Sequence, residues 1–275
     1  MLVLPCLVFY ILFAYMPMYG AIIAMKDFRL GDTIGSAPWV GLRWFREFFG
    51  GMYFWRLVKN TLIINIYQLV FGFPAPIVFA LVVNEIRVRK FKRTLQTISY
   101  MPYFISVVVV VGILNNIFGV NHGIVNIVLE SLGHEKVQFF MEPRWFRPLY
   151  VGSGIWQGFG YGAIIYIAAM SGVDMDLYEA ATIDGAKRLQ QIRHITLPSI
   201  KPTIIILLIL NLGALMSEGF QKIILMYNPA TYEVADVIST YVYRRGLIDM
   251  EYSFSTAVGL FNSVVNFGLL VAANA

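Results

Sequence analysis

The sequence predicts an all-α membrane protein with about six transmembrane helices, and three observations lead to that fold class. Of the 275 residues, 58% are hydrophobic and only 13% are charged, whereas soluble domains carry about 25% charged residues. Several apolar runs approach the roughly 20 residues that cross a bilayer. These runs mostly lack the polar face that a helix on the surface of a soluble protein would carry.

Six apolar segments are expected to form the spans. They are residues 1–24, 57–84, 97–118, 148–172, 200–217 and 252–274. The second is long enough to cross the bilayer at a tilt. In the fourth, Gly154, Gly158 and Gly162 recur every four residues, so a neighbouring helix is expected to approach this face closely. The first lacks the basic leader of a cleavable signal peptide, and we expect short polar tails to be missing from both ends.

Basic residues in the loops predict the orientation. Loop 85–95 contains Arg87, Arg89, Lys90, Lys92 and Arg93, and loop 173–201 contains Lys187, Arg188, Arg193 and Lys201. As the second and fourth connections of a six-span chain, the two loops lie on the same side of the membrane. Because Lys and Arg favour the cytoplasmic side, these loops and both termini are expected in the cytosol. Loop 218–250 then lies outside, and it is polar enough to reach water.

Residues 178–202 form the one long polar segment between apolar runs. An acidic residue near its start and basic residues toward its end favour one or two short helices between Met175 and Ile192. Gly185 allows a turn or the close approach of a partner. Pro198 and Pro202 are expected to stop one helix and begin the next. In so apolar a chain, this segment is typical of a docking surface for a cytosolic partner, because a short helix can fill a groove.

The same segment resembles the EAA motif of ABC importer permeases, with matching internal spacings. Here the motif is Glu179-Ala180-Ala181, Asp184-Gly185-Ala186 and Ile195-Thr196-Leu197-Pro198. One departure is Ile192, where sugar permeases often have Phe. The runs 93–106 and 225–229 resemble the LplB-type branch of the MalF-like sugar permeases, so the resemblance covers nearly the whole chain.

The resemblance implies a MalF/MetI-like type I importer fold. Residues 1–275 would form a single transmembrane permease domain in a bacterial inner membrane, with a cytoplasmic coupling helix in loop 173–202. The expected partners are a second permease subunit in a heterodimer, two ABC ATPase subunits that bind ATP and Mg²⁺, and an extracytoplasmic solute-binding protein. The ATPase-coupling residues are expected to be Tyr178, Glu179, Ala180, Ala181, Asp184, Gly185, Ala186, Ile195, Leu197 and Pro198.

The sequence itself provides no catalytic or cofactor motif. It has no Gly-Lys dipeptide and therefore no phosphate-binding P-loop, so ATP hydrolysis must come from another polypeptide. We expect the chain to be no enzyme, to bind no metal or other cofactor, and to bind no nucleic acid, because its basic residues do not form one surface.

The implied cargo is a carbohydrate, and polar side chains within the spans are the candidates to contact it, because such residues are costly in a bilayer unless they face a cavity or another helix. For each alone, a helix–helix hydrogen bond is as good an explanation as a ligand contact. The candidates are Asn65, Gln68, Asn115, Trp156, Gln157, Tyr161, Asn211, Ser217, Glu218, Asn262 and Asn266. The cargo is expected to be an oligosaccharide, and Arg144, Arg147, Arg244 and Arg245 in the outer loops admit acidic oligomers such as those of alginate or other uronates.

Two other functions fit the sequence less well than an ABC importer permease does. An ion-coupled secondary transporter would need carboxylates or broken half-helices at the midplane of the membrane, and the spans hold almost no central carboxylates. A membrane-embedded enzyme would need convergent reactive groups, but the three histidines, His122, His134 and His194, all lie in loops.

Overall fold

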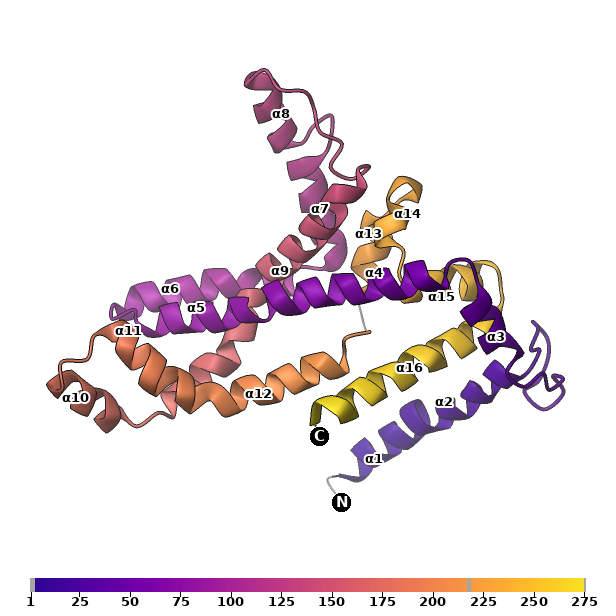
Figure 1. Ribbon diagram of the computed structural model, residues 1–275, viewed down its shortest axis with the longest axis horizontal. Helices are drawn as coiled ribbons and strands as arrows, with labels where there is room; N and C mark the ends of the chain where they lie inside the picture. The colour runs from indigo at the N-terminus through magenta and orange to yellow at the C-terminus, as the bar shows by residue number, and fades with distance from the viewer. Residues whose placement is uncertain (1–2, 217–218, 275) are drawn as a thin grey trace.

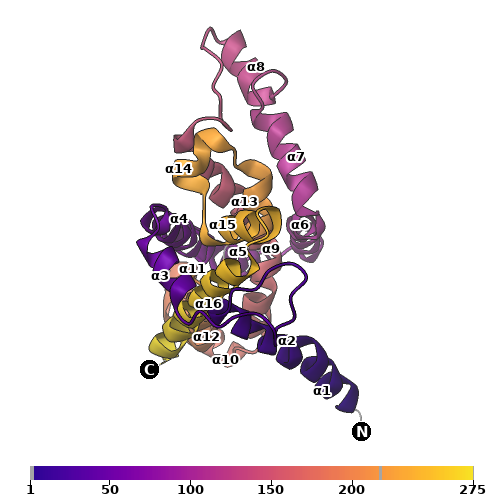
Figure 2. The same ribbon diagram turned by 90° about the vertical axis from the view of Figure 1, so that its right-hand side faces the viewer.

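The computed structural model describes residues 3–216 and 219–274, which form an elongated helical bundle with one projecting arm (Figure 1). Within these ranges there is no β-strand, and the extended backbone contributes only an isolated bridge between Lys26 and Trp39. The arm consists of α7 (Val107–Phe118) and α8 (Ile124–Ser131), and it stands away from the bundle in two perpendicular views (Figures 1 and 2). An all-α fold is therefore confirmed.

In the described ranges, four helices are long and apolar enough to cross a membrane, or up to five if a bent pair counts as one span. The four are Leu4–Met25, Phe54–Asn84, Arg188–Gly213 and Tyr252–Asn274. The expected fourth span lies in α9 (Pro143–Ser171), which has sufficient length at 29 residues. Its apolar character is diluted by glycines and by Gln157, so it falls outside this set.

Three of these helices contain a wide π turn placed just before a proline. The first helix runs through α1 (Leu4–Tyr10), a π turn (Ile11–Tyr15), α2 (Met16–Met18) and a 3₁₀ stretch (Tyr19–Met25). The next joins α4 (Phe54–Tyr67) to α5 (Pro74–Asn84) through a π turn at Gln68–Gly72. Because proline has no N–H and crowds the preceding turn, a π turn lets the helix continue across it.

The expected stop at Pro198 was wrong for the same reason. α11 (Arg188–Gln191) continues through a π turn (Ile192–Thr196) directly into α12 (Leu197–Gly213). Pro198 lies in the first turn of α12, where its missing donor is not needed, and Pro202 lies inside the helix. The fifth span therefore begins within the polar segment rather than at residue 200.

The expected third span is broken rather than straight. α6 (Arg89–Tyr100) and the 3₁₀ turn Met101–Phe104 meet α7 at an angle of 103°. Ile105 and Ser106 are both extended, and the Ser106 hydroxyl caps α7 by accepting from the N–H of Val109 at 3.4 Å. Gln157 on α9 donates to the carbonyl of Ile105 at 2.9 Å and so satisfies a backbone group that the break leaves free.

The remaining elements cover the end of the bundle opposite α10 (Met175–Ile183) (Figure 1). They are α3 (Arg43–Gly50), α13 (Phe220–Met226), the 3₁₀ turn Pro229–Thr231, α14 (Tyr232–Ala235), α15 (Ile238–Tyr243) and the π turn Arg244–Ile248. The last span, α16 (Tyr252–Asn274), begins at this end and runs back along the bundle (Figure 1). Loop 218–250 was expected to reach water, but much of its described part folds back against the bundle. Ile223, Val237 and Ile238 in this loop are almost fully buried.

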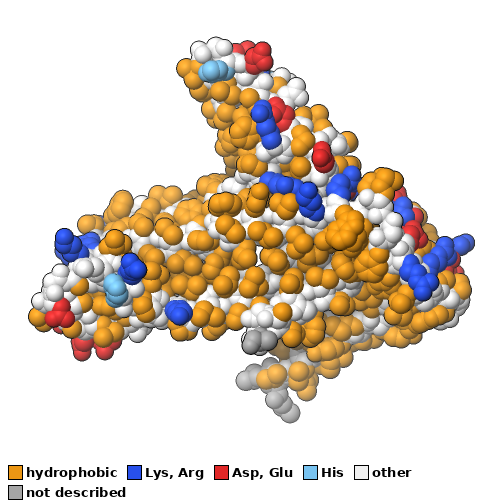
Figure 3. Space-filling view, viewed as in Figure 1, with side chains coloured by type: hydrophobic (Ala, Val, Ile, Leu, Met, Phe, Trp, Pro, Cys, Tyr) orange, Lys and Arg blue, Asp and Glu red, His pale blue; other side chains and the backbone are white. Residues whose placement is uncertain are grey.

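The surface has the character of a membrane protein. Figure 3 shows hydrophobic side chains over the middle of the bundle, whereas charged side chains lie mainly at its ends and on the arm. The two basic loops, between α5 and α6 and around α10 and α11, lie at the same end (Figure 1). They also touch, since Arg188 pairs with Glu85 at 3.8 Å.

Helix α9 lies at the centre of the packing. The prediction that its regularly spaced glycines allow a neighbouring helix to approach closely is correct only in part. A Cβ on Gly162 would lie 3.3 Å from Pro76, and one on Gly154 would lie 3.1 Å from Gln68, but one on Gly158 would meet nothing. The tightest approach is at Gly160, where a Cβ would collide with the backbone carbonyl of Ser99 on α6. Gly160 lies outside the four-residue spacing, so that pattern could not reveal it.

Replacing Gly160 with alanine is therefore expected to destabilise the fold by about 1–3 kcal/mol, because α6 or α9 must shift to admit the methyl group. Gly158→Ala is the matched control, since it adds the same methyl group to the same helix in open space. Thermal denaturation of the detergent-solubilised chain measures the difference. Equal melting temperatures for the two variants would contradict the close α6–α9 contact.

Candidate functional site

The polar segment is organised by α10, whose two ends are capped by different means. At its start, the Asp174 carboxylate accepts from the N–H of Asp176 at 3.0 Å. At its end, the N–H of Ala186 donates to the carbonyl of Ala181 at 2.8 Å, and that of Gly185 donates to Thr182 at 3.1 Å. This is a Schellman cap. It requires the φ of +77° found at Gly185, which explains the glycine in the motif.

Side chains fix α10 to the helix that follows it. The hydroxyls of Tyr178 and Thr196 are 2.8 Å apart, and Thr196 is buried in the π turn. Gln191 donates to the Thr182 hydroxyl at 3.0 Å and to the carbonyl of Ala186 at 3.2 Å. The turn between α10 and α11 is thus held by hydrogen bonds from the helix that follows it.

This segment carries four exposed large apolar side chains, which together we call the coupling ridge. They are Met175, Leu177 and Ile183 on α10, and Leu189 on α11. Ile183 is 86% exposed and Leu189 is 77% exposed. Large apolar side chains this exposed beside charged neighbours are typical of a binding surface.

The structure places the ten predicted coupling residues in two groups. Glu179, Ala180, Asp184 and Gly185 are exposed on or just after α10, and Tyr178, Ala181 and Ala186 are half-buried against α11. Ile195, Leu197 and Pro198 instead lie in the helix that continues into the span, where Leu197 packs beside buried Ile200. Their role in binding an ATPase stays a prediction.

Two of the predicted pathway residues share a polar cavity of about 520 Å³. Gln68 reaches it from the π turn after α4, and Gln157 from α9. The other lining residues are Val107, Tyr150, Gly154, Gly219, Phe220, Gln221 and Lys222. Residues from three separate helices thus bring amides, an aromatic ring and an ammonium group together.

The other asparagines predicted in the second, third and fifth spans bond within their own helices. Asn65 donates to Thr61, Asn115 to Val111 and Asn211 to Leu207, in each case to the carbonyl four residues earlier. The aromatic candidates also pack against protein. Tyr161 stacks on Tyr103 with ring centroids 3.9 Å apart, and Trp156 lines a mainly apolar cavity of about 300 Å³.

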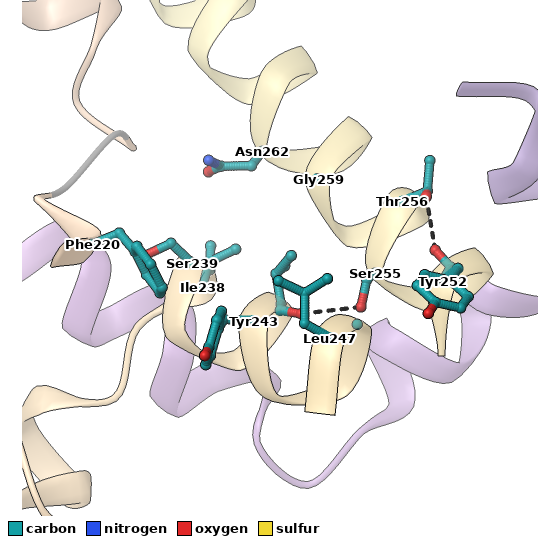
Figure 4. A pocket seen from close by; sticks show the side chains of 12 residues that line it. Phe220, Ile238, Ser239, Tyr243, Leu247, Tyr252, Ser255, Thr256, Gly259 and Asn262 are labelled. Carbon is teal, nitrogen blue, oxygen red and sulfur yellow. Dashed lines mark hydrogen bonds between the residues drawn. The ribbon is translucent and has the colours of Figure 1, made fainter. Parts of the chain in front are cut away.

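Asn262 and Asn266 of the last span hold the region after α12 in place. Asn262 donates to the carbonyl of Met216 at 3.2 Å, and Asn266 accepts from its N–H at 2.8 Å. Asn262 also lines a cavity of about 460 Å³ between α15 and α16, shown in Figure 4. Phe220 lines both this cavity and the polar cavity, so the two are neighbours. Ser217 and Glu218 lie outside the described residues.

A charged cluster at the opposite end from α10 was missed by the sequence reasoning. Asp236 is fully buried and accepts two hydrogen bonds from Arg244, at 2.8 and 2.7 Å, one from Arg56 at 3.1 Å and one from Thr240 at 2.8 Å. Burial alone would lower the pKa of Arg244, but hydrogen bonds with Asp236 and Tyr227 raise that pKa above its ordinary value. Arg244 therefore stays charged.

Of the arginines considered for acidic cargo, Arg244 and Arg245 are engaged in ion pairs, and Arg144 pairs with Glu142 at 2.6 Å. Arg147 donates to the Asn60 side chain at 2.9 Å. Within residues 3–216 and 219–274, no group of three His, Cys, Asp or Glu residues could hold a metal ion.

The geometry agrees with comparisons to known proteins. The family model described as "Binding-protein-dependent transport system inner membrane component" matches residues 72–274. Protein LplB of Bacillus subtilis (strain 168) is 43% identical over 100% of this chain and 86% of its own length. The polygalacturonan/rhamnogalacturonan transport system permease protein YteP of the same strain is 42% identical over 100% of this chain and 85% of its own length.

A solved structure has the same fold. It is a bacterial ABC transporter involved in the import of the acidic polysaccharide alginate, and one of its chains matches with a TM-score of 0.92 at 42% identity, over 99% of this chain and 92% of that chain. A second structure, of a bacterial alginate ABC transporter in complex with an alginate pentasaccharide-bound periplasmic protein, also matches with a TM-score of 0.92 at 42% identity, over 99% of this chain and 91% of that chain. The chain therefore belongs to the family of binding-protein-dependent transport system inner membrane components, the permease subunits of ABC importers.

Proposed function

We propose that this permease carries oligosaccharides across the bacterial inner membrane and forms half of the translocation pathway, with residues 1–275 acting as one transmembrane domain. A second permease subunit would form the other half, and an extracytoplasmic solute-binding protein would deliver the sugar. Two relatives that are 42% identical over at least 99% of the chain support this cargo, because their described substrates are polysaccharides. The polar cavity supplies amide groups suited to sugar hydroxyls.

In this proposal, α10 is the helix that couples the permease to two ATPase subunits, which bind ATP and Mg²⁺. The end of the bundle that carries α10 and the basic loops would face the cytosol, and both termini would lie on that side. When ATP brings the ATPases together, they would bind one arrangement of α10 better than the other. That differential affinity shifts the population between inward-open and outward-open states.

The coupling ridge is the observation that carries this proposal. Three large apolar side chains are exposed on α10, whose ends are both capped, and a fourth, Leu189, is exposed on α11. A rigid, preformed helix with an apolar face suits a groove on another protein, and Tyr178 connects its position to the span through Thr196. A passive loop would have no need for such a surface.

Serine substitutions in the ridge test the proposal. Ile183→Ser and Leu189→Ser are each expected to weaken ATPase binding about tenfold, because burial of such a side chain contributes about 1.5–3 kcal/mol. Leu30→Ser is the matched control, because Leu30 is 73% exposed in the loop that follows the first span. Co-purification of the ATPase subunits and sugar uptake by the reconstituted importer are the measurements.

The ridge assignment would be wrong if both ridge variants retained the ATPase as well as Leu30→Ser does. Uptake driven by an ion gradient, without any ATPase, would overturn the importer mechanism itself.

A further inference from the structure

Lys222 has an environment that is unusual for a lysine. It lies on α13 with only 7% of its surface exposed, and it lines the polar cavity beside Gln68 and Gln157. Its ammonium group donates to the carbonyl of Tyr150 at 3.0 Å and lies 5.1 Å from the centre of the Tyr150 ring. These contacts orient the group toward α9 but do not neutralise its charge.

The charge of Lys222 has no carboxylate partner among residues 3–216 and 219–274. An ammonium group has three donors, and the structure gives Lys222 a single hydrogen bond within those ranges. Buried lysines are costly unless they are paired with an anion, and ionisable groups within membrane proteins tend to mark the path of a substrate. Among the residues that the structure describes, none supplies an anion that would offset the burial of Lys222.

Space for that anion exists in the cavity of about 520 Å³ that Lys222 lines. A Cβ built on Gly154 would lie 3.6 Å from the Lys222 nitrogen and 3.1 Å from Gln68 Oε1. Because Gly154 has no side chain, Lys222 and Gln68 can lie close together against α9. The glutamines of the cavity add neutral amides, which can bond hydroxyls but cannot balance a charge.

We propose that Lys222 binds the carboxylate of an acidic sugar as the oligosaccharide passes through the polar cavity, so that this permease selects uronate-containing chains. A carboxylate can accept a charge-assisted hydrogen bond from the ammonium, while its sugar hydroxyls reach the amides. The inference rests on the proposed function, since it names the class of oligosaccharide and the residue that recognises it. The described substrates of two relatives, polygalacturonan and alginate, are acidic polymers.

The test uses the whole importer in proteoliposomes with its loaded binding protein at saturating concentration. The probes are trigalacturonate and the same trisaccharide with its carboxyl groups reduced to alcohols. Lys222→Gln is expected to lower uptake of trigalacturonate about tenfold or more and to lower uptake of the reduced trisaccharide by a much smaller factor. Lys222→Arg keeps the charge and is expected to retain most of the acidic uptake. The matched control is Lys59→Gln, which removes an exposed lysine.

The outcomes distinguish failure of the carboxylate site at Lys222 from failure of the proposed oligosaccharide import. Unchanged trigalacturonate uptake in Lys222→Gln, or an equal loss of both sugars, overturns the carboxylate site and leaves oligosaccharide import standing. If the wild-type importer carries neither sugar and no other oligosaccharide, the proposed function fails and the inference fails with it. A Lys222→Gln, Glu218→Gln double variant with restored uptake would show that the lysine serves Glu218, and would also overturn the proposal.

Discussion

Replacing Gly185 with valine is expected to reduce ATP-driven uptake about tenfold or more in an importer of the proposed composition. The φ of +77° at this residue closes the cap that ends α10. An L-residue in the left-handed region costs about 1–2 kcal/mol, and a β-branched one is especially disfavoured there. The variant must therefore distort the turn that aligns α10 with α11. Uptake and the ATP hydrolysed per sugar carried are the measurements.

Two further substitutions make this prediction specific. Gly185→Asn is expected to keep much of the activity, because asparagine tolerates the left-handed region better than other residues. Gly172→Ala is the matched glycine control, since its φ is −89° and a Cβ there would meet only the Ala169 carbonyl at 3.6 Å. Full uptake by Gly185→Val would show that the cap geometry does not matter for coupling.

Asp236→Asn is expected to lower the free energy of unfolding by about 3–5 kcal/mol, because removing one member of a buried ion pair leaves its partners without compensation. Here the neutral amide would face two arginines, Arg56 and Arg244, at a fully buried position. Denaturation of the chain in mixed micelles measures the loss.

The control for this experiment is Asp249→Asn, which removes an exposed carboxylate from the same region. It is expected to leave stability nearly unchanged. If Asp236→Asn is as stable as Asp249→Asn, the three-residue charge cluster does not hold α14 and α15 against α4.

Hydropathy predicted the membrane class and most of the spans, because burial in lipid depends on composition averaged over about 20 residues. It could not predict the break at Ile105 and Ser106, since the residues on both sides are apolar and the bend is fixed by a contact with distant Gln157. The continuous helix through Pro198 was missed because a π turn has no simple sequence signal.

In the candidate site, too, some features could be predicted from the sequence and others could not. The coupling segment was predictable, because its helix start, glycine cap and apolar positions are local in sequence. Lys222 and Asp236 were not, because their importance depends on burial and on residues far along the chain. Tyr150 lies 72 positions before Lys222, and Arg56 lies 180 positions before Asp236. Polar residues in loop 218–250 give no local sign that the loop folds against the bundle.

If α10 binds an ATPase as proposed, its cap separates two tasks of one short segment, which are folding and partner recognition. The hydrogen bonds of the cap come from backbone groups of Ala181, Thr182, Gly185 and Ala186. The side chains of the coupling ridge are therefore not needed to form the cap. Selection can then change those side chains to suit a different motor subunit without rebuilding the turn. Permeases with this fold would then evolve to bind different ATPase subunits. The hydrogen-bonded connection between α10 and the span would stay the same in all of them.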